Sequence, residues 1–130
     1  MSVTKVQALR CYAAMLNTLD IRKLERFLAP DFCYSSQWVF AEITCKQGYL
    51  DYIEPKLGVI KSSGSIVFAE MGEIKQAHPI GPCVLMAQNT KDNLVATVLA
   101  EVKGEFIRRL DMCLIPNVES VTRSGVYPKN

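Results

Sequence analysis

The sequence contains no long hydrophobic run, and no stretch approaches the roughly 18 consecutive apolar residues that a membrane-spanning helix requires. Its first residues also lack the basic stretch and apolar segment of a secretory signal peptide. A formal net charge of +2, with basic residues spread along the chain, offers no footprint for a phosphate backbone or an anionic bilayer. We therefore expect a cytoplasmic protein with no nucleic-acid partner and no membrane partner.

Patterns typical of metal sites and disulfide frameworks are missing too. The chain has 1 His and 5 Cys, and no two cysteines have the Cys-x-x-Cys spacing. An odd number of cysteines among apolar neighbours is typical of packing residues in a reducing compartment. His78 lies in a predicted loop before Pro79, where a solvated histidine is expected rather than a catalytic one. We expect no metal and no cofactor.

The composition does provide a core. With 130 residues, 49% hydrophobic and 22% charged, the chain fits one globular domain over residues 1–130. Hydrophobic periodicity predicts three helices in the first part of the chain, over residues 4–17, 20–29 and 44–62. Thr4 with Gln7 and Thr44 with Gln47 have capping-box spacing, and Pro55 is expected to kink or restart the third helix.

The remaining segments have the pattern of strands. A short strand is predicted over residues 32–36, followed by an aromatic loop or irregular strand over 37–43. Four longer strands are predicted over residues 66–74, 83–88, 94–102 and 106–115. Helices followed by strands predict an α+β fold with helices packed on a mainly antiparallel sheet.

The strand predicted over residues 94–102 is apolar on both faces. Alternation places Leu94 and Ala96 on one face and Val95 and Leu99 on the other. Short helices can cover only one side of a sheet, so the other side is expected to meet a second copy of the chain. A homodimer through the outer sheet face is therefore predicted.

The order of these segments resembles a known superfamily. The residues that carry the likeness are YAAMLN at 12–17, LERFLAPDF at 24–32, ITCK at 43–46 and GEFI at 104–107. In this order they are similar to the nuclear-transport-factor-2-like superfamily, which includes ketosteroid isomerases, polyketide cyclases and limonene epoxide hydrolases. The resemblance implies a strongly bent sheet closed by helices into a cone, with an apolar cavity and a dimer behind the sheet.

Asp111 is the candidate acid/base group. Alternation over residues 106–115 groups Ile107, Arg109, Asp111 and Cys113 on one face. An unpaired carboxylate in an apolar strand costs several kcal/mol of desolvation. Asp111 is therefore hydrogen-bonded, paired with a cation such as Arg109, or neutralised by a raised pKa, and the last state makes it a functional candidate. Its position also matches an acid/base aspartate that the resemblance implies from the epoxide hydrolases. The sequence fits both a functional Asp111 and an Asp111 that is only paired.

Tyr12 matches the helix tyrosine that ketosteroid isomerases use to donate to an oxyanion, and a phenol in an apolar hollow suits that task. It can equally be a core residue with a locally satisfied hydroxyl. The position of the isomerase base is occupied by Ser36, which cannot shuttle a proton alone. Steroid isomerase activity is therefore not expected.

Aromatic residues concentrate around the predicted mouth of the cavity, where planar ligands need aromatic walls and a few polar groups. The same residues can also be core, or in the case of Trp38 a dimer contact. The candidate ligand-binding residues are Tyr34, Ser36, Trp38, Phe40, Tyr49, Tyr52, Arg109 and Cys113.

Three functions fit this sequence. The leading hypothesis is a domain that binds a small apolar, cyclic or aromatic organic ligand. The second is an isomerase, dehydratase or cyclase with Asp111 as acid/base and Tyr12 or Tyr34 as hydrogen-bond donor. The third is a dimeric interaction module without chemistry. A hollow of roughly 300 Å³ or more with Asp111 at its wall would favour ligand binding over the interaction module.

Overall fold

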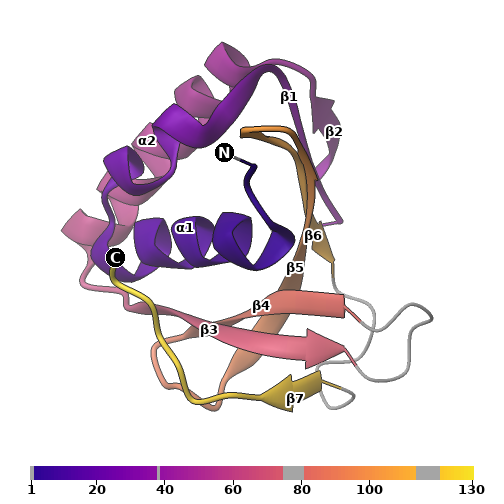
Figure 1. Cartoon of the computed structure of the whole chain (residues 1–130). Coiled ribbons are helices and arrows are strands. Elements are labelled where there is room, and N and C mark those ends of the chain that lie inside the picture. The colour runs from indigo at the N-terminus through magenta and orange to yellow at the C-terminus, as the bar shows by residue number, and fades with distance from the viewer. Residues whose placement is uncertain (1, 38, 75–80, 114–120) are drawn as a thin grey trace.

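The computed structural model describes residues 2–37, 39–74, 81–113 and 121–130, with backbone alone at 39–41. Within these ranges two α-helices and two short 3-10 turns accompany a seven-stranded sheet in an α+β arrangement (Figure 1). The helical elements are α1 (Lys5–Thr18), η1 (Ile21–Lys23), η2 (Glu25–Phe27) and α2 (Lys46–Ser63). The strands are β1 (Leu28–Ser36), β2 (Val39–Ile43), β3 (Val67–Ile74), β4 (Gly81–Gln88), β5 (Leu94–Lys103), β6 (Phe106–Cys113) and β7 (Val121–Arg123).

The described strands lie in the order β2-β1-β6-β5-β4-β3-β7. β1 and β6 run parallel, and the other neighbouring pairs are antiparallel, as the predicted mainly antiparallel sheet requires. α1 lies against one face of β3, β4 and β5, while α2 lies against β1 (Figure 1). The main core fills the space between these helices and the sheet.

The first helix begins where the sequence predicts. Thr4 and Gln7 form both bonds of a capping box, and the helix ends at Thr18 with Leu19 in the left-handed region at φ 55°. Leu9 and Tyr12 are among the buried residues of this helix. The amphipathic pattern therefore selects the face that packs on the sheet.

The prediction of a continuous helix over residues 20–29 is wrong. The chain instead makes the single turns η1 and η2, separated by Leu24 with a φ of −120°. β1 already begins at Leu28, and Pro30 lies inside it, between Leu28 and Cys33, where the pairing with β6 shifts register. A proline is tolerated at such an irregularity because no ladder hydrogen bond is required there.

The N-cap of α2 lies one residue later than predicted. The N-cap is Cys45, whose Sγ accepts a hydrogen bond from the Gly48 N–H at 3.3 Å, rather than Thr44. Pro55 lies inside a helix that runs without interruption from Lys46 to Ser63. The exposed Cys45 is therefore a capping residue, not the packing residue that the sequence predicts.

Two bulges decide which side chains face the helices. Opposite β4, Val95 is the extra residue, because Ala96 pairs with Met86 while Leu94 pairs with Ala87. Val95 therefore joins the main core and Leu94 packs on the other face of the sheet, which reverses the predicted alternation.

A second bulge lies between β5 and β6, where Ile107 and Arg109 oppose consecutive residues. Ile107 is fully buried and Phe106 is 41% exposed, again the reverse of the simple alternation. Beyond this bulge Leu110 and Met112 point into the main core. The register of β6 is thus set by packing of these inward residues.

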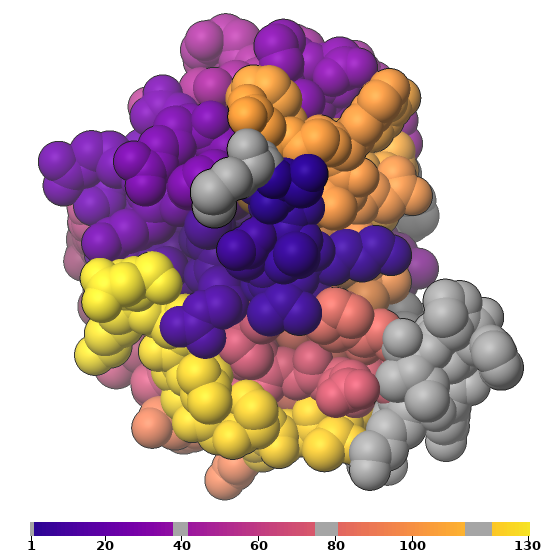
Figure 2. Space-filling view, in the orientation of Figure 1, coloured from indigo at the N-terminus to yellow at the C-terminus, as the bar shows by residue number. Residues whose placement is uncertain are grey.

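The C-terminal segment, which the sequence analysis does not assign, is tied to β3. β7 pairs with β3, and Figure 2 shows the following residues running over the surface beside α1 and β3. The Asn17 side chain joins three parts of the chain: it accepts from the Ala69 N–H at 2.7 Å and donates to the Ala69 and Pro128 carbonyls at 2.8 Å.

Neither α-helix, nor any other helix in the described ranges, has the length and apolar character needed to cross a bilayer.

Candidate functional site

A pocket of about 420 Å³ opens between α2 and the inner face of the sheet. Its buried floor is formed by Tyr12, Leu16, Tyr34, Ile53, Leu57, Met86, Ala96 and Met112. Exposed residues of the α2 C-terminal half, of the α2–β3 connection and at the end of β4 form its rim. They include Lys56, Val59, Ser63, Ser65, Ile66, Gln88 and Asn89. The pocket is therefore apolar at its base, while its opening carries both polar and apolar side chains.

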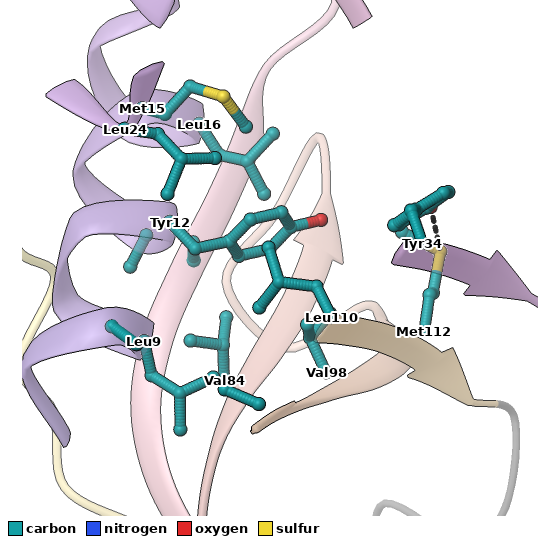
Figure 3. Close-up of a cluster of buried hydrophobic side chains, with 14 of the residues drawn as sticks. Leu9, Tyr12, Met15, Leu16, Leu24, Tyr34, Val84, Val98, Leu110 and Met112 are labelled. Atoms are coloured by element: carbon teal, nitrogen blue, oxygen red, sulfur yellow. Dashed lines mark hydrogen bonds between the residues drawn. The ribbon is translucent and has the colours of Figure 1, made fainter. Parts of the chain in front are cut away.

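Two phenol groups line the floor. The Tyr12 hydroxyl donates to Sδ of Met86 at 3.8 Å, and the Tyr34 hydroxyl lies 3.9 Å from Sδ of Met112. Figure 3 shows the Tyr12 ring extending from α1 among Val98 and Leu110, with Tyr34 against Met112. Thioether sulfur is a weak acceptor. A ligand carbonyl would offer the Tyr12 hydroxyl a stronger hydrogen bond than the methionine does.

Burial raises the pKa of both phenols, so each stays protonated and able to donate at neutral pH. Contacts with Tyr49 and Tyr34 add to the rise of the Tyr12 pKa. The Tyr34 hydroxyl also interacts by hydrogen bonds with Ser36 and Tyr52, which lower and raise its pKa respectively. Ser36 thus belongs to the hydroxyl cluster at the floor, although it does not line the pocket itself.

Tyr49 is fully buried, and its ring contacts Phe32 at a centroid distance of 5.0 Å and Tyr34 at 5.1 Å. Its hydroxyl has no hydrogen-bond partner among the described residues. Burial raises the pKa of this phenol, so it is un-ionised. Tyr49 is a core residue behind the pocket, not one of its lining residues.

The Tyr49→Phe substitution is expected to raise the free energy of unfolding by about 1 kcal/mol, because it removes a buried polar atom without leaving a partner unsatisfied. Urea denaturation measures the change. Tyr34→Phe is the matched control and should lower stability, since it breaks the interactions with Ser36 and Tyr52. Equal losses in both variants would contradict this account of Tyr49.

The structure puts Asp111 on the opposite face of the sheet from the pocket, so the expectation that it points into the cavity is wrong. Its carboxylate accepts from Nε of Arg109 at 3.0 Å and from the Ser35 hydroxyl. Arg109 also donates to Glu42 at 2.9 Å. Hydrogen bonds to Glu42 and then Asp111 raise the pKa of Arg109. The alternative interpretation, an ion pair with Arg109 along one strand face, describes what is seen.

Asp111→Asn should leave ligand affinity in the pocket unchanged and lower the unfolding free energy by only about 1 kcal/mol, because both partners remain partly exposed. Calorimetric titration and urea denaturation of the same preparation check both values. A tenfold loss of affinity would restore Asp111 to the site.

The other predicted site residues lie on the outer face, next to the pocket, or outside the described residues. Arg109 and Cys113 do not line the pocket, since they lie on the outer face with Asp111. The Tyr52 ring packs at a tilt against Tyr34, with ring centroids 5.7 Å apart, and Tyr52 contacts the lining residue Lys56. Trp38, the side chain of Phe40 and His78 lie outside the described residues.

Sequence reasoning misses Lys56, Met86 and Met112, which all line the pocket. Inward alternation from Val84 would have found Met86, and Lys56 is one helical turn beyond Tyr52. No group of three or more His, Cys, Asp or Glu side chains suited to a metal occurs in the described part of the chain.

No protein-family model and no curated protein matches the chain. Solved structures do. A protein of unknown function from Cytophaga hutchinsonii, described as NTF2-like, has 12% identity and a TM-score of 0.58 over 86% of this chain and 90% of its own. A proposed polyketide cyclase from Sinorhizobium meliloti has 15% identity and a TM-score of 0.53 over 78% and 89%.

A third neighbour, of unknown function and with a cystatin-like fold, comes from Methylobium petroleophilum. It has 10% identity and a TM-score of 0.59 over 97% of this chain and 90% of its own. At such low sequence identity, the similarity to these structures indicates a shared fold and nothing more. Helices packed on a mostly antiparallel sheet and these neighbours together identify the chain as having the nuclear-transport-factor-2-like fold.

Proposed function

We propose that the chain binds a small, largely apolar organic molecule, cyclic or aromatic, in the pocket between α2 and the sheet. The observation that carries the proposal is the pocket itself: about 420 Å³ with a buried apolar floor. This volume lies in the range of small-molecule sites. The Tyr12 donor, held against a thioether, supplies orientation for a ligand acceptor such as a carbonyl.

A binding function is favoured over an enzyme that uses Asp111. The lining residues include no Asp, Glu or His within the described ranges, so general acid/base work at the floor would fall to phenols whose pKa is raised. The resemblance to a proposed polyketide cyclase supports cyclic ligands as the first class to screen.

The screen is a thermal-shift experiment with neutral and anionic aromatic and alicyclic compounds. Selective binding to the native state raises the unfolding midpoint, and at a given concentration a tighter ligand raises it further. We expect naphthalene-sized compounds to raise it and acyclic polar compounds of similar mass to leave it unchanged. No shift with any compound of the panel, together with no co-purified ligand in native mass spectrometry, would contradict the proposal.

We further propose that two copies of the chain associate through the outer face of the sheet. Ile74, Cys83, Leu85 and Val121 form an apolar cluster there, with Leu94 and Leu99 only partly covered. Such partly exposed apolar side chains favour burial against a second copy. Sedimentation velocity at micromolar concentration tests this, and a monomer would contradict it.

A further inference from the structure

Lys56 differs in kind from the other residues around the pocket. Among the lining residues within the described ranges it is the one with a formal charge, and the rest are apolar or neutral polar. It extends from the middle of α2, whose Ile53 and Leu57 form part of the floor. A single cation therefore stands at the rim of an apolar hollow.

The partners of this ammonium group are aromatic rather than acidic. Nζ of Lys56 donates to the Tyr52 hydroxyl at 3.1 Å and lies 5.3 Å from the centre of the Tyr52 ring. Within the described ranges no carboxylate lies at ion-pair distance from Lys56. The contact with Tyr52 restrains the amine without neutralising its charge, and an ammonium has further donors to offer.

The opening beside Lys56 supplies neutral donors. Gln88 and Asn89, at the end of β4, carry side-chain amides, and Ser65 carries a hydroxyl. Beneath them, Met86 and Met112 provide an apolar wall. A molecule that fits this gradient has an apolar body and one anionic end.

We propose that the ligand is an organic carboxylate whose apolar body occupies the floor and whose carboxylate binds the Lys56 ammonium. This inference rests on the proposed function and names the ligand class of the same pocket. A charge-assisted hydrogen bond to a carboxylate is stronger than one to a neutral amide. Because Lys56 is exposed, solvent and salt weaken its contribution, so a moderate preference is expected.

The experiment compares naphthoate with naphthamide, two compounds of similar shape that differ in charge, by calorimetric titration. The unmodified chain should bind naphthoate about five- to tenfold more tightly than naphthamide. In Lys56→Met this preference should disappear, because naphthoate affinity should fall much more than naphthamide affinity. Lys61→Met, which removes an exposed lysine of the same helix that does not line the pocket, should keep the preference.

Lys56→Gln serves as a second variant that keeps a polar end at this position. It should behave as Lys56→Met does, and circular dichroism should show both to be folded. Raising the salt concentration about tenfold should weaken naphthoate binding and leave naphthamide binding unchanged.

Binding of neither compound to the unmodified chain would overturn the proposed function and this inference together. Equal binding of both compounds, or a naphthoate preference that survives in Lys56→Met and Lys56→Gln, would overturn the carboxylate assignment alone and leave the pocket as a site for neutral ligands.

Discussion

Val95→Trp is expected to weaken binding of a naphthalene-sized ligand by at least about 100-fold, because the indole occupies the space that the ligand body needs. Val95 is the bulged residue of β5 and lines the pocket beside Ala96. Val95 packs at the edge of the main core and borders the pocket of about 420 Å³, so a larger side chain here has the pocket to extend into. Filling an open hollow also causes less strain than overpacking a closed core.

Glu54→Trp is the control, since Glu54 is exposed on α2 and does not line the pocket. It adds the same indole to the chain and should bind naphthoate as the unmodified protein does. Calorimetric titration of all three proteins measures the difference. If Val95→Trp kept full affinity while remaining folded, the ligand would have to bind elsewhere.

Glu70→Ala is expected to lower the free energy of unfolding by about 3 kcal/mol, the largest stability effect of any change discussed here. Only 3% of the Glu70 side chain is exposed, and its carboxylate accepts from Nε of Arg123 at 2.9 Å. It also accepts from the Gly125 N–H at 2.7 Å and from the Tyr127 hydroxyl at 3.3 Å. Without the carboxylate these donors lose their acceptor, and the attachment of the C-terminal segment to β3 weakens.

Asp92→Ala provides the matched comparison. Asp92 pairs with the same Arg123 at 3.0 Å, but its side chain is 91% exposed. An exposed ion pair contributes little, so stability should fall by less than about 1 kcal/mol. Urea denaturation of both variants measures the two losses of unfolding free energy. Equal losses would show that the buried Glu70 carboxylate contributes no more to stability than the exposed Asp92 carboxylate.

The sequence predicts those elements whose signals are local. The capping box of Thr4 and Gln7 starts α1 as expected, and β3, β4, β5 and β6 begin within two residues of their predicted starts, whereas β7 is not predicted. The segment at residues 20–29 fails because helical spacing over one turn does not overcome the early pairing of Leu28 with Ile107 of β6. That pairing joins distant parts of the chain and leaves no local signal.

The site is predicted less well than the fold because bulges change which face a residue occupies. One extra residue in β5 moves Leu94 and Val95 to the opposite faces from those expected. Tyr12 and Tyr34, both candidates from the sequence, line the pocket, and the position of neither depends on a bulge in β5. Asp111 and Arg109 lie on the same face of the strand, as expected. Alternation alone, however, does not show which of the two faces meets the helices.

The methionine methyl groups offer the most direct test of the pocket as the ligand site. Met86 and Met112 line it, Met15 is buried in the core, and Met71 borders a separate surface hollow near Arg123. In spectra of protein with isotope-labelled methionine methyls, naphthoate should shift the signals of Met86 and Met112 and leave those of Met15 and Met71 in place. Shifts confined to Met71, or binding without any shift at Met86 and Met112, would contradict the account.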